Sequence, residues 1–234
     1  MTPNQQIEQW LDERLSQFAR TDRPFVTLSY AQSWDGSITL QSGASMALSG
    51  EQSALLTHQL RSRHDGILVG IGTVLSDDPR LNVRLCEGRD PQPVVLDAQL
   101  RMPAHAKLCH LPAKRCWLIT SSDADVPDSM QLDVMRFGGD SQGRVCLHDA
   151  LGALKRRGIH SLMVEGGAGV ISSFLRQKLV DAIVLTVAPR LVGGYKAVAD
   201  LGFATLTELP DISPMFTEML GKDLIMWGDV RYLS

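Results

Sequence analysis

Cysteine is scarce in this chain, and none of its cysteines stands in a pattern that binds a metal. The 234 residues contain four cysteines, with no C-x-x-C spacing and no accompanying pair of histidines. We therefore expect no zinc site and no other metal. Thiols without such a pattern are typical of a reducing compartment, which predicts a cytoplasmic location.

The chain also lacks a long apolar run and a strong excess of charge of one sign. No stretch approaches the roughly 18 consecutive apolar residues of a membrane span. Residues 1–10 are polar and lack the apolar core of a secretory signal. A net charge of −3 gives no general attraction for nucleic acid or membranes. We therefore expect a globular protein whose partner is a small molecule.

Short apolar runs, typical of strands buried on both faces, alternate with amphipathic segments through the middle of the chain. The apolar runs predict strands at 25–30, 66–70, 94–96, 117–119, about 134–137, 161–165 and 182–188. The segments between them predict helices at 50–63, 149–157 and 168–179, and a loop at 37–48. Two further runs within 216–230 predict a hairpin.

This order of elements predicts an α/β fold with a mainly parallel central sheet, helices on both faces and an antiparallel C-terminal hairpin. No linker or repeat interrupts the chain, which predicts a single domain over residues 1–234. Residues 1–22 are expected to form a helical arm, because apolar residues within 4–20 follow helical spacing. The apolar face of this arm could pack on its own domain or on a second subunit.

A glycine turn follows the predicted strand at 161–165. Gly166 and Gly167 let a ligand approach the backbone, and the next helix presents free N–H groups there. This arrangement suits a phosphate or diphosphate, although a tight turn without a ligand has the same pattern. Ser172 replaces the third glycine of the dinucleotide fingerprint, and the strand at 182–188 has no acidic residue. The pattern therefore indicates NADPH as the cofactor or a fold different from the standard dinucleotide-binding fold, and we favour both.

A second glycine turn follows the strand at 66–70, in the run from Gly70 to Thr73. Thr73 is expected to cap a short helix and to donate to a phosphate. Ser49 and Gln52 have the spacing of a capping box at the start of an earlier helix. Because parallel strands end at one edge of a sheet, we expect the two glycine turns to form one site.

Arginines stand on both sides of the second turn. Arg61 precedes the strand at 66–70, and Arg84 follows the turn. Both could converge on a substrate phosphate through bidentate contacts, or both could remain solvated at the surface.

Five segments together carry a family resemblance: VTLSYAQSWDGSI (26–38), LRSRHDGILVGIGTVLSDDPRLNVRL (60–85), VVLD (94–97), LMVEGGAGVISSFL (162–175) and VDAIVLTVAPRLVGG (180–194). In these segments the chain resembles the reductase family of riboflavin biosynthesis, whose fold is like that of dihydrofolate reductase. The resemblance implies a dihydrofolate-reductase-like fold, a homodimer and NADPH as cofactor. The implied reaction reduces the ribosylamino group of a pyrimidine ribosylamine 5′-phosphate to a ribitylamino group.

Carried over residue by residue, the resemblance implies separate contacts for cofactor and substrate. The implied cofactor contacts are Ala31, Thr73, Asp77, Gly166, Gly167, Ala168, Gly169, Val170, Ile171, Ser172 and Ser173. The implied substrate contacts are Ser45, Arg61, Leu81, Arg84 and Glu165. No general acid is assigned; the candidates for a catalytic role are Asp77, Glu165 and Asp35. Asp35 could instead form a plain Asx turn with Gly36.

Two features separate this sequence from many bacterial members. Their loop near 45–49 often reads Ser-x-Trp-Ile-Thr, whereas this chain has Ala47 in place of the tryptophan, and Trp34 could refill that space. The deaminase motifs H-x-E and P-C-x-x-C do not occur, which predicts a reductase without a deaminase domain. The substrate therefore stays open between the 2,5-diamino compound and its deaminated 5-amino product.

Two other functions stay open at this point, and the altered 45–49 loop motivates both. The first is a reductase of a dihydropterin or another small carbonyl compound on the same scaffold, because a fold does not fix a substrate. The second is a nucleotide-binding paralogue without catalysis.

Overall fold

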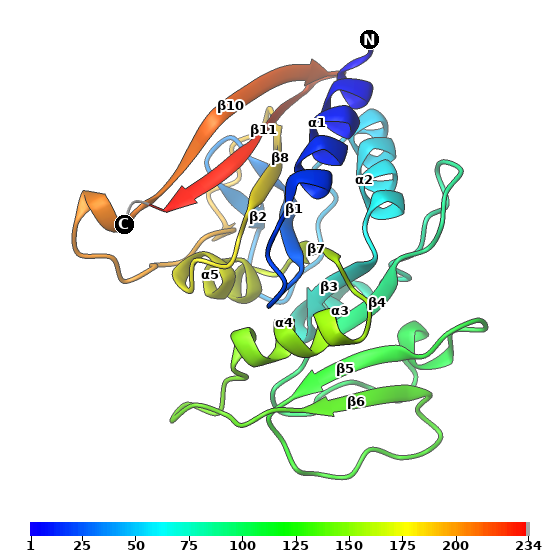
Figure 1. The fold of residues 1–234 in the computed structure, drawn as a ribbon. Coiled ribbons are helices and arrows are strands. Elements are labelled where there is room, and N and C mark those ends of the chain that lie inside the picture. The colour runs from blue at the N-terminus through cyan, green and yellow to red at the C-terminus, as the bar shows by residue number, and fades with distance from the viewer. Residues whose placement is uncertain (233–234) are drawn as a thin grey trace.

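The computed structural model describes residues 1–232, and its central feature is one sheet of nine strands (Figure 1). The order across the sheet is β10-β11-β8-β1-β7-β3-β4-β5-β6. The strands are β1 (Phe25–Ser33), β3 (Gly66–Gly70), β4 (Gln92–Leu96), β5 (Cys116–Thr120), β6 (Leu132–Arg136), β7 (Ser161–Gly166), β8 (Ala182–Ala188), β10 (Pro210–Leu220) and β11 (Asp223–Tyr232). All pairs from β8 to β6 are parallel, and β10 and β11 are antiparallel. The predicted sheet and hairpin are confirmed.

Helices cover both faces of this sheet (Figure 1). They are α1 (Pro3–Gln17), α2 (Glu51–Arg63), α3 (Ile71–Asp77), α4 (Leu147–Arg156) and α5 (Ala168–Arg176). Successive side chains of a strand point to opposite faces, so Met163 of β7 packs with α1 and α2 while Leu162 and Val164 pack with α4 and α5. Among the described residues, no helix combines the length and apolar character needed to cross a membrane.

The N-terminal helix α1 packs on its own sheet. Ile7 and Leu11 are fully buried, in one apolar cluster with Leu60 of α2 and Trp227 of β11. Burial of two such side chains stabilises the fold by several kcal/mol, at roughly 1.5–3 kcal/mol each. The sequence left two partners open for this apolar face, its own domain or a second subunit. The structure shows the face packed on α2 and β11 of the same chain.

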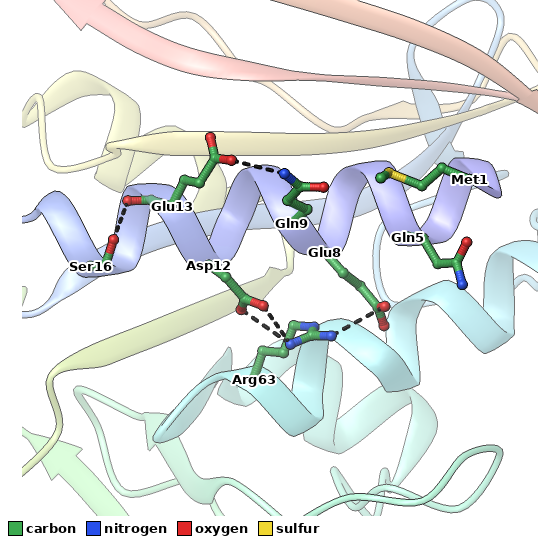
Figure 2. Close-up of a pocket in the computed structure, with 8 residues that line it drawn as sticks. All are labelled: Met1, Gln5, Glu8, Gln9, Asp12, Glu13, Ser16 and Arg63. Carbon is green, nitrogen blue, oxygen red and sulfur yellow. Dashed lines mark hydrogen bonds and ion pairs between the residues drawn. The ribbon is translucent and has the colours of Figure 1, made fainter.

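Ion pairs at the surface add a second link between α1 and α2. Figure 2 shows Arg63 of α2 beside two carboxylates of α1, with nitrogen–oxygen distances of 3.1 Å to Glu8 and 2.8 Å to Asp12. The Arg63 side chain is 30% exposed, so these pairs contribute little to stability. The shallow groove around them is lined by polar side chains of α1.

The start of α2 differs from the prediction. The residue that precedes the helix is Gly50, and neither Ser49 nor Gln52 forms the predicted capping box. Instead, the carboxylate of Asp223 in β11 accepts hydrogen bonds from the Gly50 N–H at 2.8 Å and the Ser53 hydroxyl at 2.6 Å. A buried carboxylate from the C-terminal hairpin therefore holds the start of α2, where a local capping box was expected.

Two other predicted elements have different bounds. The predicted loop at 37–48 contains the strand β2 (Ser37–Thr39), which pairs with β9 (Tyr195–Lys196) in a small second sheet. The helix predicted to reach residue 179 ends at Arg176, because Lys178 adopts a left-handed φ of 57°.

His64, directly after α2, joins this helix to β1. Its ring is fully buried, with Nδ1 2.7 Å from the Leu60 carbonyl oxygen and Nε2 2.8 Å from the Thr27 hydroxyl oxygen. A carbonyl oxygen only accepts, so Nδ1 carries the proton and Nε2 accepts from Thr27. Burial lowers the pKa of His64 to about 4, and the ring is neutral at physiological pH.

The free energy of unfolding should therefore decrease as the pH falls below 6.5. The unfolded histidine binds a proton near pH 6.5, whereas the folded one does so only near pH 4. The unfolded state thus gains protons first, and about 3 kcal/mol is lost between these two values. Urea unfolding across this range measures the slope. The variant His64→Gln keeps hydrogen-bonding groups but does not titrate. Its unfolding free energy should therefore change less steeply with pH than that of the wild type, by the equivalent of one bound proton. Identical slopes for the two proteins would contradict the neutral state assigned to His64.

Candidate functional site

The carboxyl ends of four parallel strands open into one cleft of about 1380 Å³. It is lined by Ala31 of β1, Gly70 of β3, Leu96 of β4 and Glu165 of β7. Pockets for small ligands have volumes of roughly 300–1,000 Å³, so this cleft has room for an extended ligand beside a second small molecule. The cleft lies at the sheet edge where open α/β sheets bind their ligands.

The turn between β7 and α5 depends on glycine. Gly166 has a φ of 115° and Gly167 a φ of 88°, and side chains are strained in this region. The helix α5 begins at Ala168 without a side-chain cap, and Ala168 and Gly169 line the cleft. The N–H groups and the helix dipole at this uncapped end favour an anion in the cleft.

The two glycine turns touch each other, as the sequence predicted. A Cβ atom at Gly70 would lie only 2.7 Å from a Val170 methyl carbon, and one at Gly167 would lie 3.2 Å from the Thr73 hydroxyl oxygen. The Thr73 hydroxyl donates to the Gly166 carbonyl at 3.4 Å. Thr73 does not cap α3, which was the prediction, because the capping position is Gly70 and Thr73 lies inside the helix.

Arg61 and Glu165 form a bidentate ion pair next to the cleft. The Arg61 Nε and Nη2 atoms donate to the two Glu165 oxygens at 2.5 and 2.7 Å, and Nη1 donates to the Asn82 carbonyl at 3.0 Å. Burial, the largest influence, lowers the pKa of Arg61, but the charge and hydrogen bonds of Glu165 together raise it above its ordinary value. Arg61 therefore stays charged and bound to Glu165.

Arg84 lies at the surface beside this pair. Its Nη1 atom is 3.4 Å from the Asn82 side-chain oxygen, and its backbone N–H donates to His58 Nδ1 at 3.1 Å. Burial, together with the charges of Arg61 and Arg84, lowers the pKa of His58 to about 4, so its ring is neutral and accepts this bond. Both arginines thus contact Asn82, and of these two arginines only Arg61 has a carboxylate partner within residues 1–232. Their convergence on a substrate phosphate stays a prediction.

Most of the predicted site residues line the cleft. These are Ala31, Ser45, Thr73, Asp77, Glu165, Gly167, Ala168, Gly169, Val170, Ile171 and Ser173. The predicted residues outside the lining are Asp35, Arg61, Leu81, Arg84, Gly166 and Ser172. The Ser172 hydroxyl is buried and accepts from the Ala199 N–H at 2.9 Å. The Leu81 side chain packs in the apolar core, and the residue is buried.

Asp35 is enclosed by hydrogen bonds and does not line the cleft. It accepts from the Lys196 ammonium at 2.6 Å, from the Ser33 and Ser37 hydroxyls, and from the backbone N–H groups of residues 192 and 193. The bond from Lys196 is the main reason that the pKa of Asp35 lies far below its ordinary value. Asp35 is therefore a carboxylate without a proton to donate, and it ties the turn at 34–36 to β9.

The cleft is also lined by residues that the sequence did not single out, among them Met46, Arg101, Arg144 and Tyr195. Arg101 and Arg144 follow predicted strands at the same sheet edge, a signal that could have found them. Tyr195 is placed by pairing between β9 and β2, for which the sequence has no local signal. Trp34 is 66% exposed and does not line the cleft, so it does not refill the space of the missing loop tryptophan.

The fold and cleft together define a class of protein. At one edge of a mainly parallel sheet lie two joined glycine turns, an uncapped helix start and a buried arginine–glutamate pair. Glycine turns and helix starts at this edge are typical of α/β proteins that bind phosphate-bearing small molecules. The chain belongs to the RibD C-terminal domain family, whose model matches residues 24–225.

Known proteins similar to this chain include both short and long members of the family. The 2,5-diamino-6-ribosylamino-4(3H)-pyrimidinone 5′-phosphate reductase of Methanothermobacter thermautotrophicus is 35% identical over 89% of this chain and 99% of its own length. The riboflavin biosynthesis protein RibD of Aquifex aeolicus is 30% identical over 93% of this chain. This chain covers 61% of the length of that protein.

Solved structures agree with this relationship. The Saccharomyces cerevisiae riboflavin biosynthesis reductase Rib7 superposes with a TM-score of 0.77 at 26% identity, over 96% of this chain and 99% of Rib7. RibD of Acinetobacter baumannii superposes with a TM-score of 0.78 at 25% identity, over 90% of this chain and 59% of that protein.

Proposed function

We propose that this chain is an NADPH-dependent reductase of riboflavin biosynthesis, working as one domain in the cytoplasm. Its substrate is a pyrimidine ribosylamine 5′-phosphate, either the 2,5-diamino compound or its 5-amino product, and its product carries a ribitylamino group. The observation that carries the proposal is the cleft at the two joined glycine turns, in a chain whose relatives are named as these reductases.

The cofactor half of the cleft fits a dinucleotide. The uncapped start of α5 would hold the diphosphate through the N–H groups of Ala168 and Gly169, and a Cβ atom at Gly169 would meet nothing within 4 Å, so ligand space is free there. Thr73 and Asp77 line the same cleft, where Asp77 would orient the nicotinamide ribose. When bound, NADPH supplies the hydride for C1 of the ring-opened sugar.

The substrate half offers groups that bind and orient. The Glu165 carboxylate would hold sugar hydroxyls or the pyrimidine, and Ser45 lines the cleft nearby. Arg84 would bind the substrate phosphate from the rim. Asp35 is fully bonded elsewhere and Glu165 is bound to Arg61 as a carboxylate, so Asp77 remains the candidate for handling the proton that the sugar nitrogen gains.

We also propose a homodimer, formed through the C-terminal hairpin. The face of α1 that the sequence analysis offered for this role is buried within the chain. The edge strand β10 instead exposes Met215, Phe216 and Met219, by 49%, 41% and 55%. An edge strand with exposed apolar side chains is a natural surface for a second copy.

The direct test is turnover. Purified protein mixed with NADPH and each of the two ribosylamine phosphates should lose the absorbance of the reduced nicotinamide, with formation of a ribityl product. NADPH alone should bind, with a change in its fluorescence. Binding without turnover on either compound would favour a non-catalytic paralogue, and turnover only on a dihydropterin would reject the proposed substrate.

Discrimination between NADPH and NADH gives a second test. Arg101 and Arg144 line the end of the cleft beyond β4, and Arg144 is already paired with Asp140 at 2.8 Å. Arg101 has no carboxylate partner among residues 1–232 and is suited to bind the 2′-phosphate. Replacing Arg101 with Ala should weaken NADPH binding by about 1.5–3 kcal/mol and leave the affinity for NADH unchanged. The exposed Arg115→Ala serves as control. Equal loss for both cofactors would contradict this role.

A further inference from the structure

We infer that the ring of Tyr195 covers the nicotinamide end of NADPH, and that Asp35 is a positioning residue, which holds Tyr195 at the cleft. The inference rests on the proposed function and deepens it, since it assigns residues to the reacting end of the cofactor. Four features of the molecule support it: the place of Tyr195 along the cleft, the face of the sheet on which it lies, its exposed ring, and the way its backbone is held.

Tyr195 lies at the end of the cleft beside β1. It pairs with Thr39 of β2, the strand that follows β1 and contacts it, and both residues line the cleft. The start of α5, where we propose the diphosphate, follows β7, which is the neighbour of β1 in the sheet. Arg101 follows β4, on the other side of β7. A cofactor with its 2′-phosphate at Arg101 and its diphosphate at α5 therefore extends its nicotinamide towards β1 and Tyr195.

The pair of strands β2 and β9 packs on the face of the sheet that α5 covers. Ile38 of β2 and Ala197, directly after β9, belong with Val170 of α5 to one apolar cluster. The proposed phosphate contact Arg84 lies instead beside His58 of α2, a helix that packs on the opposite face. Tyr195 is thus on the cofactor side of the cleft, which points to the nicotinamide rather than the pyrimidine of the substrate.

Tyr195 offers an exposed aromatic ring to the cleft. Among the described residues, only Tyr30 and Tyr195 line the cleft with an aromatic side chain. Tyr30 packs against the apolar core, and burial raises its pKa to about 12. Tyr195 is 41% exposed and belongs to none of the apolar clusters. A ring in this position can stack on a planar ring such as nicotinamide and exclude water from it.

The backbone on both sides of Tyr195 is bound to Asp35. The Asp35 carboxylate accepts hydrogen bonds from the N–H groups of residues 192 and 193 at 2.8 and 2.9 Å, before Tyr195. It accepts from the Lys196 ammonium at 2.6 Å, directly after Tyr195. Because the carboxylate binds the chain on either side of Tyr195, it limits where the ring can lie.

Pairing alone is a weak restraint on β9. This strand has two residues, and its register with β2 is irregular. Gly194 brings the chain close to β2, because a Cβ atom there would overlap the Thr39 carbonyl oxygen, and its N–H donates to the Ser37 hydroxyl at 3.0 Å. Asp35 does not line the cleft, so any effect of this carboxylate on a ligand must act through the residues that it holds, Tyr195 among them.

The experiment separates the two ends of the cofactor by comparing NADPH with adenosine 2′,5′-bisphosphate, which lacks the nicotinamide. Calorimetry measures the affinity for each, and the fluorescence of the reduced nicotinamide reports how well its ring is shielded from water. The variants are Tyr195→Ser, Tyr195→Phe, Asp35→Asn and the double variant of Tyr195→Ser with Asp35→Asn. Trp34→Ser is the matched control, because Trp34 is an exposed aromatic residue next to Asp35 that does not line the cleft.

Tyr195→Ser should weaken NADPH binding by about 3- to 10-fold and reduce the gain in nicotinamide fluorescence, because the nicotinamide loses a stacking partner. Its affinity for the bisphosphate should stay within about twofold of the wild type, as should both affinities of Trp34→Ser. Tyr195→Phe keeps the ring and should match the wild type in affinity and fluorescence. The KM for the ribosylamine phosphate should be the same in all these proteins.

Asp35→Asn removes the charge that binds Lys196, and it should lower the affinity for NADPH and the nicotinamide fluorescence without changing the affinity for the bisphosphate. The double variant should bind NADPH within about twofold of Tyr195→Ser alone, because Asp35 acts through that ring. Thermal unfolding checks that each protein folds. If Asp35→Asn does not fold, Lys196→Gln removes one bond of the same cluster and takes its place in both comparisons.

Four results would overturn the inference. The first is wild-type affinity and fluorescence for NADPH in Tyr195→Ser. The second is an equal loss of affinity for NADPH and the bisphosphate. The third is a rise in KM for the ribosylamine phosphate with NADPH binding unchanged, which would place the ring on the pyrimidine. The fourth is multiplication of the two single effects in the double variant. If the wild-type protein does not bind NADPH, the proposed function fails and the inference fails with it, whereas wild-type binding and turnover with any of these four patterns rejects the inference alone.

Discussion

Arg61 and Glu165 stand 104 positions apart in the chain, and their bidentate ion pair joins the end of α2 to the end of β7. The pair is nearly buried, so removing either partner would leave an uncompensated charge, a loss that typically costs about 3–5 kcal/mol. Because Glu165 is followed by the glycine turn, the same contact fixes the point where the sheet meets the cleft. His64 anchors α2 to β1 a few residues beyond Arg61, which keeps the helix end in register with the sheet.

Close packing of the two glycine turns is the second constraint on the cleft. Gly70 approaches Val170 so closely that a side chain at residue 70 would push α5 away from β3. Gly167 faces Thr73 in a similar way, and the turns are linked by the hydrogen bond from Thr73 to the Gly166 carbonyl. The start of α5 is therefore held at the cleft without a side-chain cap, and its N–H groups remain available to a diphosphate.

The sequence predicted the strands well, because buried parallel strands are short apolar runs and the turns between them contain glycine. Two glycine turns at one sheet edge predicted the position of the cleft, and eleven of the residues named from the turns or from the resemblance line it. The sequence analysis failed where the structure depends on contacts between distant segments. Asp223 of β11 binds the start of α2, and pairing of β9 with β2 brings Tyr195 to the cleft. It also did not show that Arg61 is bound to Glu165, since the charge pattern is the same for a free and a paired arginine.

A crystal structure of the protein with NADPH tests the central claim most directly, namely that the joined glycine turns hold the cofactor. The account predicts the diphosphate at the N–H groups of Ala168 and Gly169, the nicotinamide towards Glu165, and the Arg61–Glu165 pair intact. A diphosphate bound elsewhere in the cleft, or a Glu165 carboxylate released from Arg61, would contradict it.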